Sequence, residues 1–283
     1  MTVYFIIIEI YEIHFYFSVY LFTTNKLFWK HYQDTAKYYC KYLFTYQLDS
    51  TDAINIGKEE MVLLIGDNFS KFSSMRTFLK DSLLDSNNEK RLQPEQAMAF
   101  SFGLPKTKFP ESINKLYLED RMIFSSTLGL DKFAYEESLN IISWSIEKET
   151  KVFGNILCTR ATCRFMGRDY IAWFAKDIPI FEGPYKFSRL PGLVVNIYDS
   201  KNHYNYTLLE FKTNTKHLMT VNKDCLKVSK KNFYKAEKDF YLNFSQSIES
   251  IPNLSASSID PIAINKVIER YKKRNNPIEL IHE

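Results

Sequence analysis

The chain has 283 residues, enough for one large domain or two ordinary ones with a substantial core. Its 19 Tyr and 23 Phe, against only 8 Gly, exclude a disordered or low-complexity protein. The 37 basic and 33 acidic residues leave a formal net charge of +4, too small an excess for a dedicated nucleic-acid-binding protein.

Residues 1–33 form an atypical apolar N-terminal extension. Glu9, Glu12 and His14 lie in the middle of its apolar run, where ionisable side chains disfavour a membrane-spanning helix. No basic residue precedes Lys26, so the pattern of a secretory signal peptide is missing. Three interpretations stay open: a degenerate export signal, an extra strand, or a non-native extension from an upstream start, which is slightly favoured. A metal site at the three ionisable residues is the least favoured interpretation.

Past this extension, alternating apolar and polar residues predict antiparallel strands. Residues 38–48 place their aromatic side chains on every second position, which is typical of a half-buried strand. Residues 60–66 and 69–75 follow as two more strands, and Asp67-Asn68 between them suits a hairpin turn. The sequence thus predicts the beginning of a β-meander.

Residues 76–120 lose this alternation, so we expect a loop-rich insert with a short helix near its start. Strands resume at Arg121 and continue to the C-terminal third of the chain. Gly167-Arg168 fits a two-residue hairpin turn with a positive φ at the glycine, and Trp173 lies on the strand that returns from it.

A stiff loop follows, bracketed by Gly183-Pro184 and Pro191-Gly192. We expect the aromatic side chains between the two brackets, including Phe187, to fold onto the sheet as a cap. The simplest interpretation of this loop is a rigid, self-packed connection.

The C-terminal region changes from strand to helix. Asp260-Pro261 supplies an N-cap and a first-turn proline, and apolar residues then recur with helical spacing up to Tyr271. The sequence therefore predicts a mainly β (α+β) fold: an antiparallel meander that forms a curved or partly closed sheet, with a C-terminal amphipathic helix packed on it. Residues 34–283 form one domain in this prediction.

The run from Trp144 to Asp199 resembles the GLPGLI family, whose six-residue motif here reads RLPGLV over residues 189–194. The resemblance extends over about residues 37–283 and includes KKRNNPIEL near the end. Arg189 stands where the family has glycine, and Val194 stands where it has isoleucine. The matching positions are Cys158, Gly167, Arg168, Trp173, Pro179, Gly183, Pro184, Phe187, Leu190, Pro191, Gly192 and Leu193.

The resemblance implies an exported protein of Gram-negative bacteria, located in the periplasm or cell envelope, whose function is unknown. It implies a structural or binding role for the matching residues. The chain has no nucleophile elbow, zinc-protease motif, phosphate-binding glycine loop or C-x-x-C pair, so we assign no catalytic residue, cofactor or metal. These patterns favour a non-enzymatic protein.

The four cysteines do not form a recognisable disulfide framework. Cys158 and Cys163 are five residues apart, which puts them on opposite faces of a strand and roughly 16 Å apart. Cys40 and Cys225 stay open as partners, although buried thiols are the default. A Cys158–His203 catalytic dyad is a minor hypothesis.

Two positively charged features have both structural and functional interpretations. Residues 212–238 contain eight lysines, which fit a solvated face better than a surface for anionic lipid headgroups. Arg168 and Trp173 could form a cation–π contact across their hairpin, with a structural role.

Three function classes follow. The leading hypothesis is a non-enzymatic envelope or periplasmic component that binds a partner protein or an apolar ligand; a hydrophobe carrier would be excluded by a filled inner sheet face. The alternative is a hydrolase with an unrecognised site, which should show a cleft with a histidine or paired carboxylates. An assembly component should show an exposed apolar patch near residues 183–194. Association with a membrane surface is compatible with the lysines, nucleic acid is not expected, and the oligomeric state stays open.

Overall fold

The structure, a computed structural model, describes residues 32–86, 103–221, 224–249 and 255–281. The predictions for residues 1–31, including the export signal and Glu9, Glu12 and His14, lie outside these residues. No helix in the described part of the chain is both long and apolar enough to cross a membrane.

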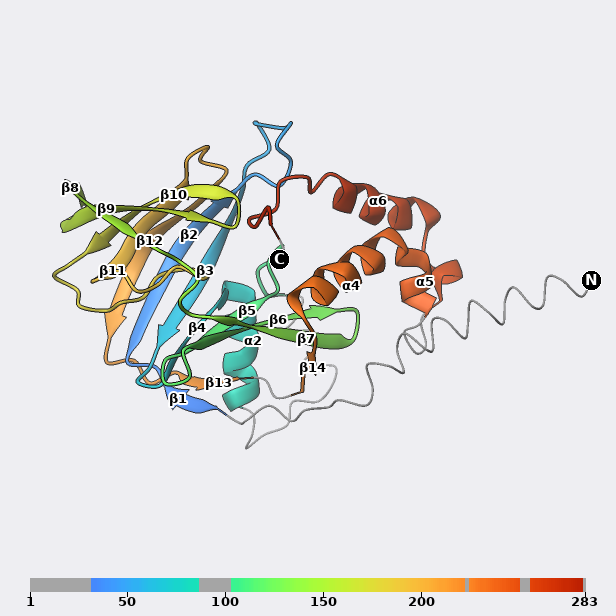
Figure 1. Ribbon diagram of the computed structural model, residues 1–283. Helices are drawn as coiled ribbons and strands as arrows, with labels where there is room; N and C mark the ends of the chain where they lie inside the picture. The colour runs from blue at the N-terminus through green and yellow to red at the C-terminus, as the bar shows by residue number, and fades with distance from the viewer. Residues whose placement is uncertain (1–31, 87–102, 222–223, 250–254, 282–283) are drawn as a thin grey trace, which may run out of the picture.

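Twelve strands form one open sheet in the order β14-β7-β6-β5-β4-β3-β2-β12-β11-β10-β9-β8 (Figure 1). All neighbouring pairs are antiparallel except the short parallel contact between β14 and β7. The mainly β prediction, with its large antiparallel sheet and C-terminal helix, is confirmed. The strand bounds are β1 Gln33–Thr35, β2 Tyr38–Tyr46, β3 Gly57–Ile65, β4 Phe69–Ser74, β5 Ser112–Leu116, β6 Arg121–Leu128, β7 Asp131–Ser138, β8 Ser145–Phe153, β9 Ile156–Phe165, β10 Arg168–Ala175, β11 Leu193–Asp199, β12 Tyr204–Thr213, β13 Leu218–Thr220 and β14 Leu226–Lys227.

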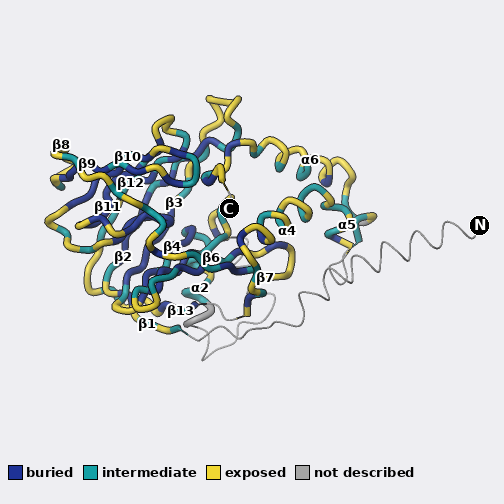
Figure 2. Tube along the Cα trace, in the orientation of Figure 1, coloured by how far each residue is buried: buried dark blue, intermediate teal, exposed yellow. Residues whose placement is uncertain are grey.

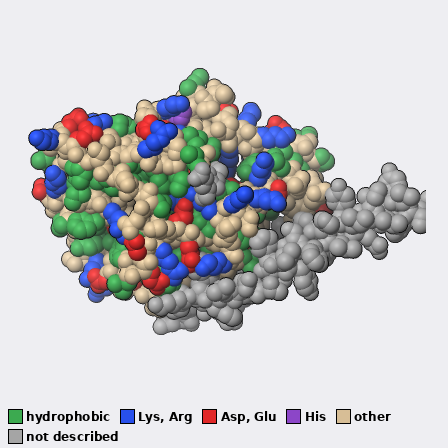
Figure 3. Space-filling view, viewed as in Figure 1, with side chains coloured by type: hydrophobic (Ala, Val, Ile, Leu, Met, Phe, Trp, Pro, Cys, Tyr) green, Lys and Arg blue, Asp and Glu red, His purple; other side chains and the backbone are tan. Residues whose placement is uncertain are grey.

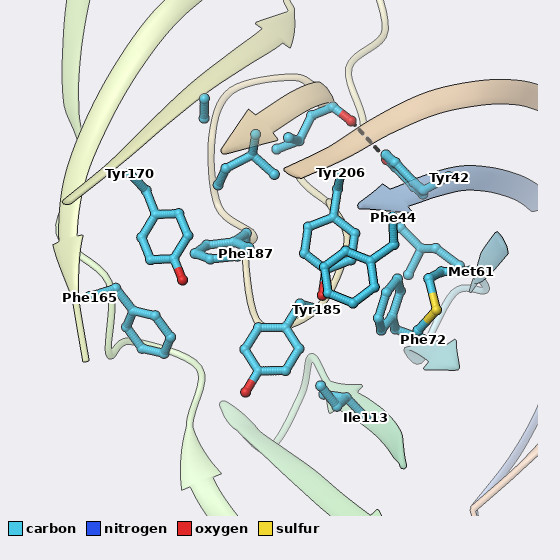
Figure 4. Packing of buried hydrophobic residues seen from close by; sticks show 14 of the residues in the cluster. Tyr42, Phe44, Met61, Phe72, Ile113, Phe165, Tyr170, Tyr185, Phe187 and Tyr206 are labelled. Carbon is cyan, nitrogen blue, oxygen red and sulfur yellow. Dashed lines mark hydrogen bonds between the residues drawn. The ribbon is translucent and has the colours of Figure 1, made fainter. Parts of the chain in front are cut away.

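The two faces of the sheet carry different cores. The main core lies on the inner face, where Phe44 of β2 stacks on Tyr206 of β12 with ring centroids 4.1 Å apart (Figure 4). Tyr42 donates its hydroxyl to the carbonyl of Val194 at 2.7 Å, which satisfies a polar atom inside this core. The alternation predicted for residues 38–48 is therefore confirmed as β2, with its aromatic face buried.

The outer face has two smaller apolar clusters. One lies beneath helix α2 (Met75–Ser86) and the β1–β13 ribbon, and it includes Tyr39, Val62 and Ile123. The other lies on β9–β11 around Trp173. Figure 2 shows the central strands buried and β8 largely exposed, and the surface over β8–β11 carries apolar side chains between charged ones (Figure 3).

The region 76–120 is only partly the loop-rich insert that we expected. Its short helix is present as α2, but residues 112–116 form β5, an interior strand paired with β4 and β6. Asn114 and Lys115 interrupt the apolar pattern there, yet both are buried. A fully buried lysine on a strand is uncommon, so the pattern alone did not reveal β5.

The β9–β10 hairpin turn is one residue earlier than predicted. Met166 and Gly167 occupy the turn with φ of 45° and 84°, and Arg168 already pairs with Phe165 as the first residue of β10. Two positive φ angles define a type I′ turn, which matches the twist of the two strands.

A helical layer follows β14. Helix α4 (Lys230–Leu242) packs on β7, and its Phe233 contacts Phe124 of the inner core at 5.4 Å between ring centroids. Helices α5 (Phe244–Glu249) and α6 (Pro261–Lys272) pack against α4, so the C-terminal helix joins the sheet through α4 (Figure 1). Asp260 caps α6 by accepting a hydrogen bond from the Ile262 amide at 2.9 Å, as predicted.

The connection between β10 and β11, residues 176–192, folds onto the inner face and fills it. Tyr185, Phe187 and Leu190 are at most 3% exposed, so the predicted aromatic cap is confirmed (Figure 4). A hydrogen bond joins the two ends of the connection, because the Leu193 amide donates to the Ile178 carbonyl at 3.0 Å. This loop is called the plug loop below.

Three plug-loop residues, Tyr185, Arg189 and Gly192, have a positive φ. Gly192 has φ of 154°, and a Cβ there would lie far inside contact distance of the Ala175 carbonyl. Arg189 has φ of 70° although it is not glycine, and its guanidinium pairs with Asp120. Arg189 thus adopts, at the expense of strain, a backbone conformation that glycine would adopt freely.

We expect Gly192→Ala to lower the free energy of unfolding by about 2–4 kcal/mol, because the added methyl group strikes the backbone at Ala175. Urea unfolding followed by tryptophan fluorescence measures this change. Gly103→Ala is the matched control, since a Cβ at Gly103 meets nothing within 4 Å. Equal stability of the two variants would contradict the close approach.

We expect Arg189→Gly to be more stable than Arg189→Ala by about 1 kcal/mol. Both substitutions remove the same ion pair with Asp120, so their difference isolates the strain at positive φ. Thermal unfolding of the two variants side by side is the measurement, and a more stable alanine variant would refute the strained conformation.

Candidate functional site

The structure does not bring the twelve predicted positions into one site. Gly167 and Arg168 lie at the β9–β10 turn, and most of the others lie in or beside the plug loop. Cys158 and Trp173 lie instead in the outer cluster on β9–β11. The remaining predicted positions are Pro179, Gly183, Pro184, Phe187, Leu190, Pro191, Gly192 and Leu193, of which Pro179 and Pro191 are exposed.

The predicted cation–π contact between Arg168 and Trp173 does not form. The two residues are five positions apart on one strand, so their side chains lie on opposite faces of the sheet. Arg168 lies 4.9 Å from the ring centroid of Tyr204, on the inner side. Trp173 instead has the ammonium of Lys151 5.7 Å from its ring centroid.

The Cys158–His203 dyad is also wrong. Along the strand direction, Cys158 of β9 lies beside the C-terminal end of β10, next to the Thr159–Phe174 pair. His203 lies in the turn after β11, beside the N-terminal end of β10, where Tyr170 pairs with Asp199. These two positions differ by four residues, about 13 Å along the strand. Burial raises the pKa of the Cys158 thiol to about 11, which makes it a poor nucleophile.

All four cysteines are buried, and none forms a disulfide bond in the described part of the chain. The prediction that Cys158 and Cys163 cannot pair is confirmed, and the open pairing of Cys40 with Cys225 does not occur. Cys40 belongs to the inner core and Cys225 to the outer cluster beneath α2, so the sheet separates them.

The C-terminal segment, residues 275–280, packs against β10, β12 and the plug loop, and the site that these elements form around it is called the groove below. Arg168, 5% exposed, is the main contact. Its guanidinium donates to the Ile278 carbonyl at 3.1 Å, to the Pro277 carbonyl at 2.6 Å and to the Asn276 side chain at 2.6 Å. It also pairs with Asp199 at 3.3 Å. One arginine thus reads three consecutive residues of the segment.

Further hydrogen bonds join the C-terminal segment to β10, to β12 and to the residue that follows β2. Tyr170 donates to the Ile278 carbonyl at 3.3 Å, and Tyr204 donates to the Asn276 carbonyl. Asn276 in turn donates its side-chain amide to the Gln47 carbonyl at 2.6 Å. These hydrogen bonds involve both the main chain and the side chains of the segment, as in the binding of a peptide.

Glu279 ends the groove in a buried cluster of four alternating charges. Lys186 and Lys230 each contact both Glu137 and Glu279, and the two Lys230 distances are 2.8 Å. Tyr185 donates to Glu279 at 2.6 Å. The side chains of Lys186 and Glu279 are 0% exposed. This four-charge cluster joins the plug loop, β7, α4 and the C-terminal segment.

The charges shift one another's protonation equilibria. Burial alone would raise the pKa of Glu279, but Lys186 and Lys230 outweigh burial and hold it below its ordinary value. Burial would likewise lower the pKa of Lys230, and the two glutamates raise it instead. Glu279 and Lys230 therefore both stay charged at neutral pH.

Lys115 of β5 anchors the plug loop from another side. Its ammonium donates to Glu182 at 2.8 Å, to the Gly183 carbonyl at 2.9 Å and to the Phe187 carbonyl at 3.3 Å. These three bonds use its full donor capacity. Burial lowers the pKa of Lys115 against the opposing effect of Glu182, yet its saturated donors indicate a structural role.

The two described clefts lie outside the inner core. One, of ≈490 Å³, is lined by residues of β9 and β10 such as Arg160 and Asp169; the other, of ≈440 Å³, lies beneath α2. Neither is lined by a histidine within the described part of the chain, which gives the hydrolase alternative no support. No group of three described His, Cys, Asp or Glu side chains is placed to hold a metal ion.

The aromatic side chains of β2 pack in one core with those of the plug loop, an arrangement that does not support a carrier with an apolar cavity lined by β2. The assembly hypothesis predicts an exposed apolar patch near the plug loop, where Phe181 is 60% exposed. The lysine-rich stretch is not uniformly a solvated face, because Lys230 is buried in the four-charge cluster.

Sequence reasoning missed the charged residues of the groove. Glu137, Lys186 and Lys230 are far apart in the chain, and nothing in their local sequence marks them as partners. Glu279 lies in the KKRNNPIEL run near the end of the chain, which is the one stretch of the groove that the sequence analysis singled out.

No family model and no curated protein matches the sequence. Among solved structures, PNGF-II in space group P21 has a TM-score of 0.43 at 11% identity and covers 64% of this chain and 28% of its own. PNGF-II in space group C2 has a TM-score of 0.44 at 10% identity, covering 71% and 32%. This chain therefore spans about a third of the length of those structures, and similarity this low does not establish a common fold.

We expect Glu279→Gln to lower the free energy of unfolding at pH 7 by about 3–5 kcal/mol, because two buried lysines then share one carboxylate. A carboxyl group whose pKa is lowered by folding stabilises the protein above its unfolded pKa, and this contribution is lost as pH falls through the folded pKa. The deficit should therefore shrink below pH ~4.

Chemical unfolding at pH 7 and at low pH measures both effects. Glu269→Gln is the control, because Glu269 forms an exposed ion pair with Lys272 and should change stability by less than about 1 kcal/mol. If the two variants were equally stable at pH 7, the four-charge cluster would not contribute as described.

Proposed function

We propose that the protein is a non-enzymatic binding and assembly component whose groove accepts an Asn-Pro-Ile-Glu segment. In the closed form, its own C-terminal segment occupies the groove. The single observation that supports this most is the Arg168 contact, which addresses two main-chain carbonyls and a side chain of the segment.

The groove requires an occupant on physical grounds. Without the segment, the guanidinium of Arg168 would lose three acceptors, and two buried lysines would be left with Glu137 alone. Unpaired buried charges are strongly unfavourable, so an empty groove is disfavoured. A segment that leaves must be replaced by an equivalent one.

A second copy of the same chain can supply the segment that replaces the first one in the groove. The C-terminal segment begins three residues after α6 ends at Lys272, and Lys273 and Arg274 form the short link between them. A change of backbone angles in this link would carry the segment into the groove of a neighbouring molecule, as in domain swapping. Exchange of this kind uses contacts that already exist.

Location and family are part of the same proposal. We propose a GLPGLI-like protein of the periplasm or cell envelope, supported by the motif at residues 189–194 and by the NNPIEL run that fills the groove. Lys231, Lys235 and Lys238 of α4 are exposed and are compatible with a membrane surface nearby.

The test uses the full chain with a protease site inserted between Arg274 and Asn275. After cleavage of the folded protein, a fluorescent peptide of sequence NNPIELIHE is added, and its anisotropy is measured. We expect saturable binding as the peptide replaces the cleaved segment. A peptide with Gln at the position of Glu279 should bind at least tenfold more weakly.

Two results would contradict the proposal. The cleaved protein could stay folded without ever taking up the peptide, or it could unfold without being restored by excess peptide. Either shows that the groove is a fixed part of the fold and not a binding site.

A further inference from the structure

The cleft of ≈440 Å³ beneath α2 has the composition of a ligand site and is independent of the groove. Its floor is the outer face of β4–β7, one wall is α2, and Thr220, Val221 and Cys225 line another side. A volume of this size is within the range of small-molecule sites.

The walls of the cleft carry excess positive charge. Lys71, Arg76, Lys80 and Lys132 line it, against one carboxylate, Asp81. Lys71 pairs with Asp81 at 2.7 Å and so neutralises it. Lys80 and Lys132 have no ion-pair partner within 4 Å among the described residues. A cleft with this balance attracts anions.

A buried polar side chain also lines the cleft without a partner. Asn114 is 2% exposed, and its Oδ1 has no hydrogen-bond partner within the described part of the chain. Such an atom is unfavourable unless a ligand or water satisfies it. Hydroxyl groups of Ser112, Ser125 and Thr127 lie on the same strands around it.

We propose that this cleft binds a small molecule that carries a phosphate group. A phosphate monoester has about −1.5 to −2 charges, which matches the ammonium groups of Lys80 and Lys132 together with the guanidinium of Arg76. The remainder of the ligand supplies a hydroxyl or amine donor to Asn114. A free phosphorylated metabolite carries such a monoester, whereas a phospholipid headgroup carries a phosphate diester with a single negative charge; both present phosphate oxygens to the basic groups of the cleft.

The test measures binding of inorganic phosphate, glycerol 3-phosphate and phosphatidylglycerol vesicles to the full chain by calorimetry. We expect saturable binding of glycerol 3-phosphate, tighter than that of inorganic phosphate. The double variant Lys80→Gln/Lys132→Gln and the single variant Asn114→Asp should each weaken binding at least tenfold. Lys148→Gln on the exposed edge strand β8 is the matched control and should leave binding unchanged.

The outcomes separate the sources of the ligand. Binding to vesicles but not to glycerol 3-phosphate, lost in the double variant, assigns the site to a lipid headgroup. Binding that is unchanged in the double variant, or the failure of folded wild-type protein to bind any of the three probes, overturns the proposal. Thermal unfolding of each variant checks that it is folded. If a variant does not fold, the single variant Lys80→Gln is used in its place.

Discussion

The position of the plug loop depends on buried ion pairs. Lys115 holds Glu182 from β5, and the four-charge cluster holds Lys186 between β7, α4 and the C-terminal segment. A buried ion pair contributes little net stability compared with a well-packed apolar pair, but the loss of one partner is costly. These pairs therefore define where the loop lies more than they add to total stability.

The loop in turn determines where function can reside. Phe187 and its neighbours are buried against the inner face of the sheet, where an apolar ligand of the predicted kind would have to lie (Figure 4). The polar features to which we assign ligands are the groove, which holds the C-terminal segment, and the basic cleft beneath α2. The first is suited to a peptide and the second to a phosphorylated small molecule.

Sequence patterns predicted what depends on neighbours along the chain. The period of two over residues 38–48 and the capped helix from Pro261 are both local, and both are present as β2 and α6. The strand β5 was missed because Lys115, which looks like a surface residue, finds its partner 67 residues away in Glu182. The groove was missed for the same reason, since its contacts join residues up to 229 positions apart. Pairing between distant charges leaves no local signal.

The central claim is that the four-charge cluster unites the plug loop, β7, α4 and the C-terminal segment. Hydrogen exchange measured by mass spectrometry on the wild-type protein and Glu279→Gln tests it directly. The account predicts that residues 176–192, β7 and the first turn of α4 lose protection together with the C-terminal segment. Loss of protection confined to residues 275–281 would contradict it, because the segment would then be an appendage on an independently stable loop.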